Sequence, residues 1–191
     1  MLAAMKFQAG TACRTAPSDV VTFWRNAGPG LWFAKNSAFD RRFRERFLSA
    51  YEATAGHALN GWQASPLGSL ALLLLTDQFP RNAFRGTARM YATDGLARAF
   101  ARTALARSYM AAVDPDLRLF FCLPFAHSED VADQALSVAL NAQLGQPWLA
   151  HAQSHQEIIR RFGRFPHRNP LLGRTSTPEE QAFLDQGGFA G

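Results

Sequence analysis

The amino-acid sequence predicts an all-α protein of about eight or nine helices. Through most of the chain, apolar side chains recur with the spacing of one face of a helix. No segment alternates apolar and polar residues convincingly, so no β-strand is predicted. Helix-start and helix-stop residues follow one another at short intervals. Because short links place successive helices side by side, we expect antiparallel helix pairs.

Length and composition are typical of one folded domain. The chain has 191 residues, of which 48% are hydrophobic, and its formal net charge is +5. We expect residues 18–191 to form a single helical domain and residues 1–17 a flexible tail. All basic residues except Lys6 and Lys35 are arginines. The planar guanidinium of Arg binds carboxylates and phosphates through two parallel hydrogen bonds, which Lys cannot do.

The sequence carries no signal for export or for a membrane span. The longest apolar run, Leu70–Leu75, is too short to cross a bilayer. Residues 1–17 lack the continuous apolar region of a secretory signal. Cys13 and Cys122 are the only cysteines, and they support neither a disulfide framework nor a zinc site. We therefore expect a cytoplasmic protein with no membrane partner.

Two helices are expected before residue 60. Ser18 can cap the first helix, and Gly28-Pro29-Gly30 ends it. Asn36 or Ser37 begins the second, a long helix that runs to about Ala55. The second helix has one apolar stripe with a residue in every turn, made of Phe39, Phe43, Phe47 and Tyr51. Its arginines lie mostly off that stripe, as on a solvated helix face.

The next helix is expected to be central and buried. Ser65-Pro66 gives the favoured order of a cap followed by proline at the first helical position. The segment from Leu67 to Leu75 is apolar on all sides, as in a helix that is covered all round. It leads into the polar segment Asp77–Asn82. A charged Asp77 beside such a helix needs a partner, and Arg81 is the nearest candidate in sequence.

Three further helices have their own start signals. Thr93 can cap a helix over about residues 94–112. Asp114-Pro115 can open a short helix that Pro124 ends. Ser128 can cap a helix that Gly145 ends, which would place Glu129 and Asp130 in its first turn, where the helix dipole favours carboxylates.

The last two expected helices flank a loop that is rich in arginine. Pro147 opens a helix that leads into Arg160–Asn169, a segment with four arginines, a histidine and an asparagine around two phenylalanines. Gly163 and Pro166 break any regular element there. Thr177-Pro178-Glu179-Glu180 is a capping box with proline at the first helical position, which indicates the start of the final short helix.

Polar residues gather in three segments at helix ends: Asp77–Asn82, His127–Asp130 with Gln134, and His155–Asn169. Backbone groups at helix ends are free to bind a ligand as well. If these ends lie on the same side of the protein, the three segments form one pocket. The candidate ligand-binding residues are Asp77, Arg81, Asn82, His127, Glu129, Asp130, His155, Arg164, His167, Arg168 and Asn169.

Anion recognition is the leading hypothesis for this pocket. Arg81, Arg164 and Arg168, together with helix N-termini, suit an anionic small molecule or an acidic peptide. The same arginines can instead neutralise neighbouring carboxylates in a structural network, and that alternative stays open. Arginines used in such a network leave few free donors for a nucleic-acid groove, so nucleic acid is the less favoured partner.

Two alternatives come from other functional classes. A metal-dependent hydrolase would use His127, Glu129, Asp130, His155 or His167, and His151 stands four residues before His155, as in many metal-binding pairs. However, the HExxH motif is incomplete, no nucleophile stands out, and the cofactor is unknown, since neither a P-loop nor a dinucleotide glycine pattern is found. A helical scaffold for a protein partner is the third hypothesis. The sequence leaves open whether the protein is an enzyme.

Four segments of the chain resemble the bacterial domain of unknown function 924 family: LLLLTDQFPRNAFRGT, FFCLPFAHSEDVADQ, IIRRFGRFPHRN and STPEEQAFL. The similarity extends from about Asp19 to Phe189. It implies an all-α, tetratricopeptide-like superhelical fold. It also implies that Asp77–Asn82, His127–Asp130, His155 and Gly163–Asn169 are signature positions of the family. It implies no activity.

Overall fold

The computed structural model describes residues 15–189 of the chain, and the predicted tail therefore lies almost wholly outside the described residues. Helices connected by turns make up the described part, and it contains no strand. The predicted all-α class is thus confirmed. Ten segments of this part are α-helical, and two of them, α2 and α5, have only four and five residues.

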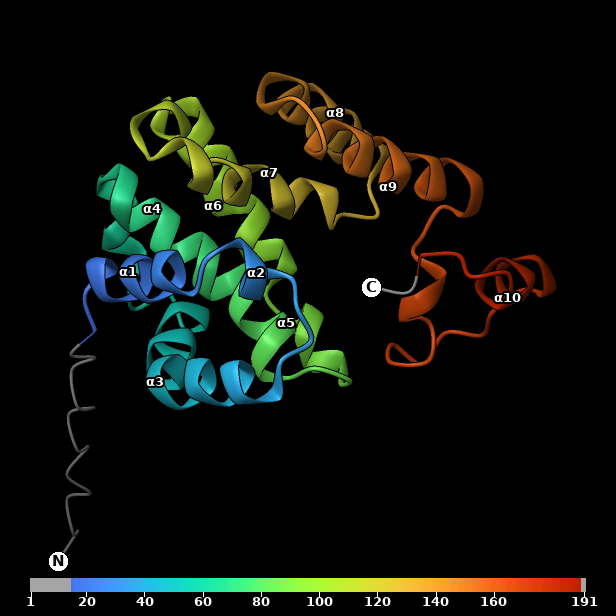
Figure 1. Ribbon diagram of the computed structural model, residues 1–191, viewed down its shortest axis with the longest axis horizontal. Helices are drawn as coiled ribbons and strands as arrows, with labels where there is room; N and C mark the ends of the chain where they lie inside the picture. Colours follow the sequence, from blue (N-terminus) through green and yellow to red (C-terminus); the bar gives the residue numbers. More distant parts are fainter. Residues whose placement is uncertain (1–14, 190–191) are drawn as a thin grey trace, which may run out of the picture.

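The elements follow one another in a simple order (Figure 1). The α-helices are α1 (Pro17–Ala27), α2 (Pro29–Trp32), α3 (Ser37–Ala55), α4 (Pro66–Leu73), α5 (Phe79–Ala83), α6 (Asp94–Ala106), α7 (Leu119–Ala126), α8 (Val131–Leu144), α9 (Trp148–Phe162) and α10 (Pro178–Asp185). The remaining turns of helix are η1 (Asn60–Ala64), η2 (Leu74–Gln78), η3 (Ala88–Tyr91), η4 (Tyr109–Ala112), η5 (Pro115–Leu117) and η6 (Pro166–Arg168).

Helices α1 to α7, together with Leu140 of α8, enclose one large apolar core. The predicted stripe of α3 is buried, since Phe39, Phe43, Phe47 and Tyr51 are each at most 2% exposed. Phe43, for example, packs against several other aromatic rings, including Trp24 of α1 and Phe79 of α5. Aromatic contacts of this kind add to the stability that burial of apolar area provides.

The segment α4–η2–α5 runs through this core as one continuous stretch. Leu70–Leu75 are at most 1% exposed, which confirms the predicted central helix, but Leu67 beside the cap is 41% exposed and does not belong to the core. Residues Leu74–Gln78 form one wide turn of π-helix before Pro80. Such turns change the direction in which side chains leave a helix and are frequent at functional sites.

The C-terminal part has a second, smaller apolar cluster. It consists of Ile158, Ile159 and Phe165, with Phe162 and Phe183 packed against them. Figure 1 shows α8 and α9 side by side, and η6 and α10 as a separate group beyond the end of α9. The α8–α9 pair is compatible with the tetratricopeptide-like arrangement that the resemblance implies. Within residues 15–189, every helix is too short or too polar to cross a membrane.

Cap signals in the sequence located helix starts more accurately than helix ends. Asn36, Ser65 and Thr177 cap α3, α4 and α10 as predicted. The helix predicted over 94–112 already ends at Ala106, and Pro124 lies inside α7 instead of ending it.

Two serines predicted as caps do not cap a helix. Helix α1 begins at Pro17, before Ser18. Ser128 instead donates from Oγ to Asp133, and Asp130 is the cap of α8. Glu129 and Asp130 consequently precede α8 and do not lie in its first turn.

Candidate functional site

The three polar segments predicted from the sequence meet in space. Asp77 lies in η2, His127 follows the last turn of α7, and Arg168 ends η6. His127 Nδ1 lies 2.7 Å from Asp77 Oδ1. Arg168 Nη2 donates to the main-chain carbonyl of His127 over 2.9 Å. His155 joins them from α9, with its ring centroid 6.5 Å from that of His127.

Asp77 is an ionised carboxylate held inside the protein. Its residue is 1% exposed, and Gln78 Nε2 donates to its Oδ2 over 2.6 Å. Arg81, one helical turn later, places Nη1 3.1 Å from its other oxygen. Burial alone would raise the pKa of Asp77, but Arg81 and His127 outweigh burial and lower the pKa to about 2.

Arg81 is paired with two carboxylates. Besides Asp77, it makes a two-pronged ion pair with Asp94 at the start of α6, with distances of 2.9 and 3.1 Å. The two carboxylates and these hydrogen bonds outweigh burial and raise the pKa of Arg81. Buried pairs with this geometry retain their charges because each partner replaces the water that the other has lost.

His127 is a neutral imidazole with a fixed orientation. Burial and the neighbouring Arg81 lower its pKa, although Asp77 acts in the opposite direction. Because an ionised Asp77 can only accept, the proton of the neutral ring is assigned to Nδ1, which leaves Nε2 unprotonated. A histidine oriented in this way can accept a hydrogen bond or a proton from a bound molecule.

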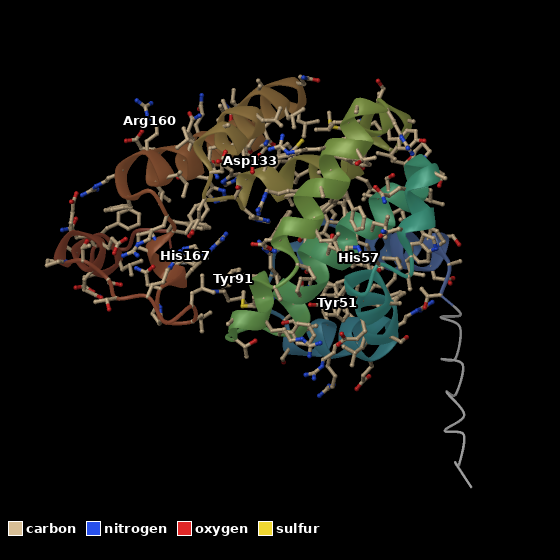
Figure 2. The ribbon with its side chains drawn as sticks, turned by 180° about the vertical axis from the view of Figure 1, so that it is seen from behind. Tyr51, His57, Tyr91, Asp133, Arg160 and His167 are labelled. Atoms are coloured by element: carbon tan, nitrogen blue, oxygen red, sulfur yellow. The ribbon has the colours of Figure 1, made fainter. Side chains whose placement is uncertain are left out.

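A cavity of about 390 Å³ lies against this cluster. Its volume is in the range of small-molecule sites. The polar lining consists of Gln78, Arg81, Asn82, Arg85, Tyr91, His127, Asn141, His151, His155, His167 and Arg168. The apolar lining consists of Trp32, Phe33, Met90, Leu119, Leu123, Ala126, Trp148, Ala152 and Phe189. Tyr91 of η3 and His167 of η6 lie near each other in Figure 2, although they are far apart in sequence.

Three buried nitrogen atoms of cavity-lining residues have no hydrogen-bond partner among residues 15–189. They are Nδ1 of His155, Nδ1 of His167 and Nε of Arg168. A buried polar atom without a partner is costly, and an ordered water, an ion or a bound molecule can supply the partner that it lacks. Burial, helped by the charge of Arg168, lowers the pKa of His155 to about 3 and that of His167 to about 4.

Several of the predicted site residues serve the scaffold. Arg164 makes a two-pronged ion pair with Glu180 of α10, and Asn169 donates to the same carboxylate. Glu129 is paired with Arg174, and Asp130 accepts from two main-chain N–H groups of α8. None of these four predicted residues lines the cavity.

Asn82 both lines the cavity and serves the scaffold. It lines the cavity, but its Nδ2 already donates to Asp40 of α3 over 2.8 Å. Arg85 lines the cavity as well and pairs with the same Asp40 at 3.0 Å. Both side chains therefore tie α3 to this part of the site.

Sequence reasoning missed some residues of the site. The sequence marks Asp94 only as the first residue of the helix that Thr93 can cap, and it gives no signal for Tyr91. In the structure Asp94 pairs with Arg81, and the ring of Tyr91 packs against the guanidinium of Arg168. Trp32 and Phe33 are of a residue type that is typical of a core. Trp32 is buried and packs on Trp24, but Phe33 is 51% exposed, and both line the cavity. A charged first-turn residue such as Asp94 carries no signal that distinguishes a cap from an ion pair.

The metal-dependent alternative finds no ligand set in the described part of the chain. Among residues 15–189, no three His, Cys, Asp or Glu side chains form a group that could hold a metal ion. The two guanidinium groups beside His127 also oppose a cation there.

Comparison with known proteins places the chain in a family. Residues 20–188 match the model of a family described as "Bacterial protein of unknown function (DUF924)". A solved structure of a protein of unknown function from Agrobacterium tumefaciens is 54% identical. The similarity covers 90% of this chain and 97% of that one, with a TM-score of 0.88. No curated protein matches. The chain therefore belongs to the bacterial DUF924 family.

Proposed function

We propose that the cavity binds a small organic anion, whose charged group meets the arginine and histidine wall and whose body lies on the apolar wall. The observation that carries this proposal is the set of three buried, unpartnered nitrogens at one cavity, on His155, His167 and Arg168. A polar group of a ligand that reaches one of these atoms gives it the hydrogen bond that it lacks, which offsets its loss of contact with water.

The two walls favour an amphipathic molecule. Trp32, Phe33 and Trp148 provide aromatic surface, and Leu119 and Leu123 of α7 extend it. Covering apolar surface of this kind with a ligand removes it from water, which stabilises the complex. A few placed polar groups fix the orientation of the ligand.

The volume of the cavity favours a small molecule over an acidic peptide. At about 390 Å³, it is close to the lower end of the range for ligand sites. The arginines of the cluster are largely engaged, as Arg81 is with Asp77 and Asp94, which leaves too few donors for a polyanion. Arg164 no longer belongs to the proposed binding set because Glu180 occupies its guanidinium.

A thermal-shift screen against organic acids, phosphorylated metabolites and nucleotides tests the proposal. A ligand at about a hundred times its Kd stabilises the protein by about 2.7 kcal/mol. Since each kcal/mol moves the Tm of a protein of this size by about 2–4 °C, such a ligand is readily seen. The shift should disappear in Arg168→Gln and persist in the matched control Arg161→Gln, because Arg161 forms an exposed pair with Glu179 and does not line the cavity.

Two results would count against the proposal. One is the absence of any shift for all three classes of anion. The other is a shift of equal size in Arg168→Gln and in the unchanged protein, which would place the binding elsewhere on the surface.

A further inference from the structure

The two buried arginines at the cavity differ in how completely they are neutralised. Arg81 has Asp77 at 3.1 Å and both oxygens of Asp94 at 2.9 and 3.1 Å. Arg168 reaches only one carboxylate oxygen, on Asp94, at 3.7 Å, which is beyond hydrogen-bond distance. Its other polar contact is the neutral carbonyl of His127. Arg168 is therefore the cation of this site that lacks a close anionic partner among the described residues.

The pKa values are consistent with this difference. The two carboxylates raise the pKa of Arg81 despite its burial. Burial and repulsion from Arg81 lower the pKa of Arg168, and Asp94 offsets this only in part. Arg168 is 6% exposed, so water supplies little of the missing stabilisation.

The charges of the whole wall also restrict the ligand. Within residues 15–189, three arginines line the cavity, Arg81, Arg85 and Arg168, and three carboxylates face them, Asp77, Asp94 and Asp40. The wall therefore has no excess positive charge. Any anion therefore adds its full charge to a balanced wall. One negative charge can be stabilised by direct contact with Arg168, whose nearest carboxylate oxygen is 3.7 Å away, whereas Arg81 and Arg85 already have close carboxylates and offer less to a second charge.

The guanidinium of Arg168 is held in place for such a contact. It lies between two aromatic rings, with its central carbon 4.7 Å from the ring centroid of Tyr91 and 4.5 Å from that of Phe165. Its Nε has no partner among residues 15–189. Carboxylates and phosphates both match the edge of a guanidinium with two hydrogen bonds, so this geometry favours an oxyanion and the charge of the wall distinguishes between the two classes.

We infer that the ligand of this cavity is a monocarboxylic acid with an apolar body, and that its carboxylate binds Arg168 between His155 and His167. The inference rests on the proposed function, because it specifies the organic anion of the same cavity. The body of the ligand lies against the aromatic wall formed by Trp32, Phe33 and Trp148. A phosphate ester or a dicarboxylate is disfavoured by the charge balance.

Four small probes with the same aromatic body distinguish these classes. They are 3-phenylpropanoate, phenylsuccinate, phenyl phosphate and the neutral 3-phenylpropanamide, each titrated into the full-length protein by calorimetry at pH 8 and one salt concentration. We expect the monocarboxylate to bind at least about ten-fold more tightly than the other three, a difference of about 1.4 kcal/mol. Arg168→Gln should remove this preference, and Arg161→Gln should keep it.

A second variant protects the test against a loss of folding. Arg168→Lys retains the positive charge but has neither Nε nor the planar edge, so it should also lose most of the preference. Far-UV circular dichroism of each variant shows whether it is folded before it is titrated. A folded Arg168→Lys that keeps the full preference would contradict the assignment of the carboxylate to Arg168.

The possible failures point to different conclusions. If phenyl phosphate or phenylsuccinate binds as tightly as 3-phenylpropanoate, the anion site is correct but the monocarboxylate class is wrong. If the amide binds as tightly as the carboxylate, the apolar wall binds ligands without an anion site. If none of the four probes binds, both the proposed function and this inference are overturned.

Discussion

Replacing Arg81 with Met should lower the free energy of unfolding by about 3–5 kcal/mol, the cost of breaking a buried ion pair. The side chain of Asp77 is 2% exposed and that of Asp94 is 12% exposed, so neither carboxylate can regain its water when Arg81 is removed. His127 would remain as a partner of Asp77, but its pKa is already lowered, which limits the charge it can provide.

Urea unfolding at pH 7 measures this effect, with Arg161→Met as the control. Arg161 pairs with Glu179 on the surface, with side chains 49% and 66% exposed, and such a pair contributes about 0–1 kcal/mol. Adding Asp77→Asn to Arg81→Met should restore part of the loss because it removes the unpaired charge. A loss below about 1 kcal/mol in Arg81→Met would mean that the cluster is not a buried ionic network.

The protein should lose stability as the pH falls from about 6.5 to about 4. In the folded state the pKa of His155 is about 3 and that of His167 about 4, both below the ordinary value of 6.5. Between those values the unfolded chain takes up protons that the folded chain excludes, so protonation favours unfolding. Two shifts of this size correspond to an effect on the order of a few kcal/mol.

The double variant His155→Gln/His167→Gln isolates this effect. Since Gln does not titrate, the dependence of the unfolding free energy on pH between 6.5 and 4 should become flatter than in the unchanged protein. The loss expected below about pH 4 should remain in both proteins, because Asp77 and Glu180 have pKa values of about 2 and are protonated only there. Parallel pH profiles above pH 4 would show that these histidines are not buried as neutral rings.

Much of the fold could be predicted because the relevant signals are local. The stripe from Phe39 to Tyr51 repeats with the period of a helix, and the capping box at Thr177 contains both of its partners within four residues. Helix ends were less predictable. Pro124 was expected to end a helix, but it lies within α7, where tertiary packing stabilises the chain around it.

The site could be predicted only as far as its polar segments. Asp77 and Arg81 are one turn apart on the same stretch, so their pairing follows from the sequence. The contact of Asp77 with His127 joins residues far apart in the chain, and local patterns carry no information about it. The partner of Arg164 was hidden for another reason. Glu180 has a complete local explanation as a member of the capping box, although it also holds Arg164 and Asn169.

The most direct test of the central claim is to identify what the protein carries when it is purified. The unchanged protein, Arg168→Gln and Arg161→Gln would each be purified rapidly at low salt and then deliberately denatured. Mass spectrometry would identify the small molecules that each protein releases. If the cavity binds an organic anion, one acid should be released by the unchanged protein and by Arg161→Gln but not by Arg168→Gln. Equal release from all three proteins, or none above the level of a buffer control, would contradict the claim.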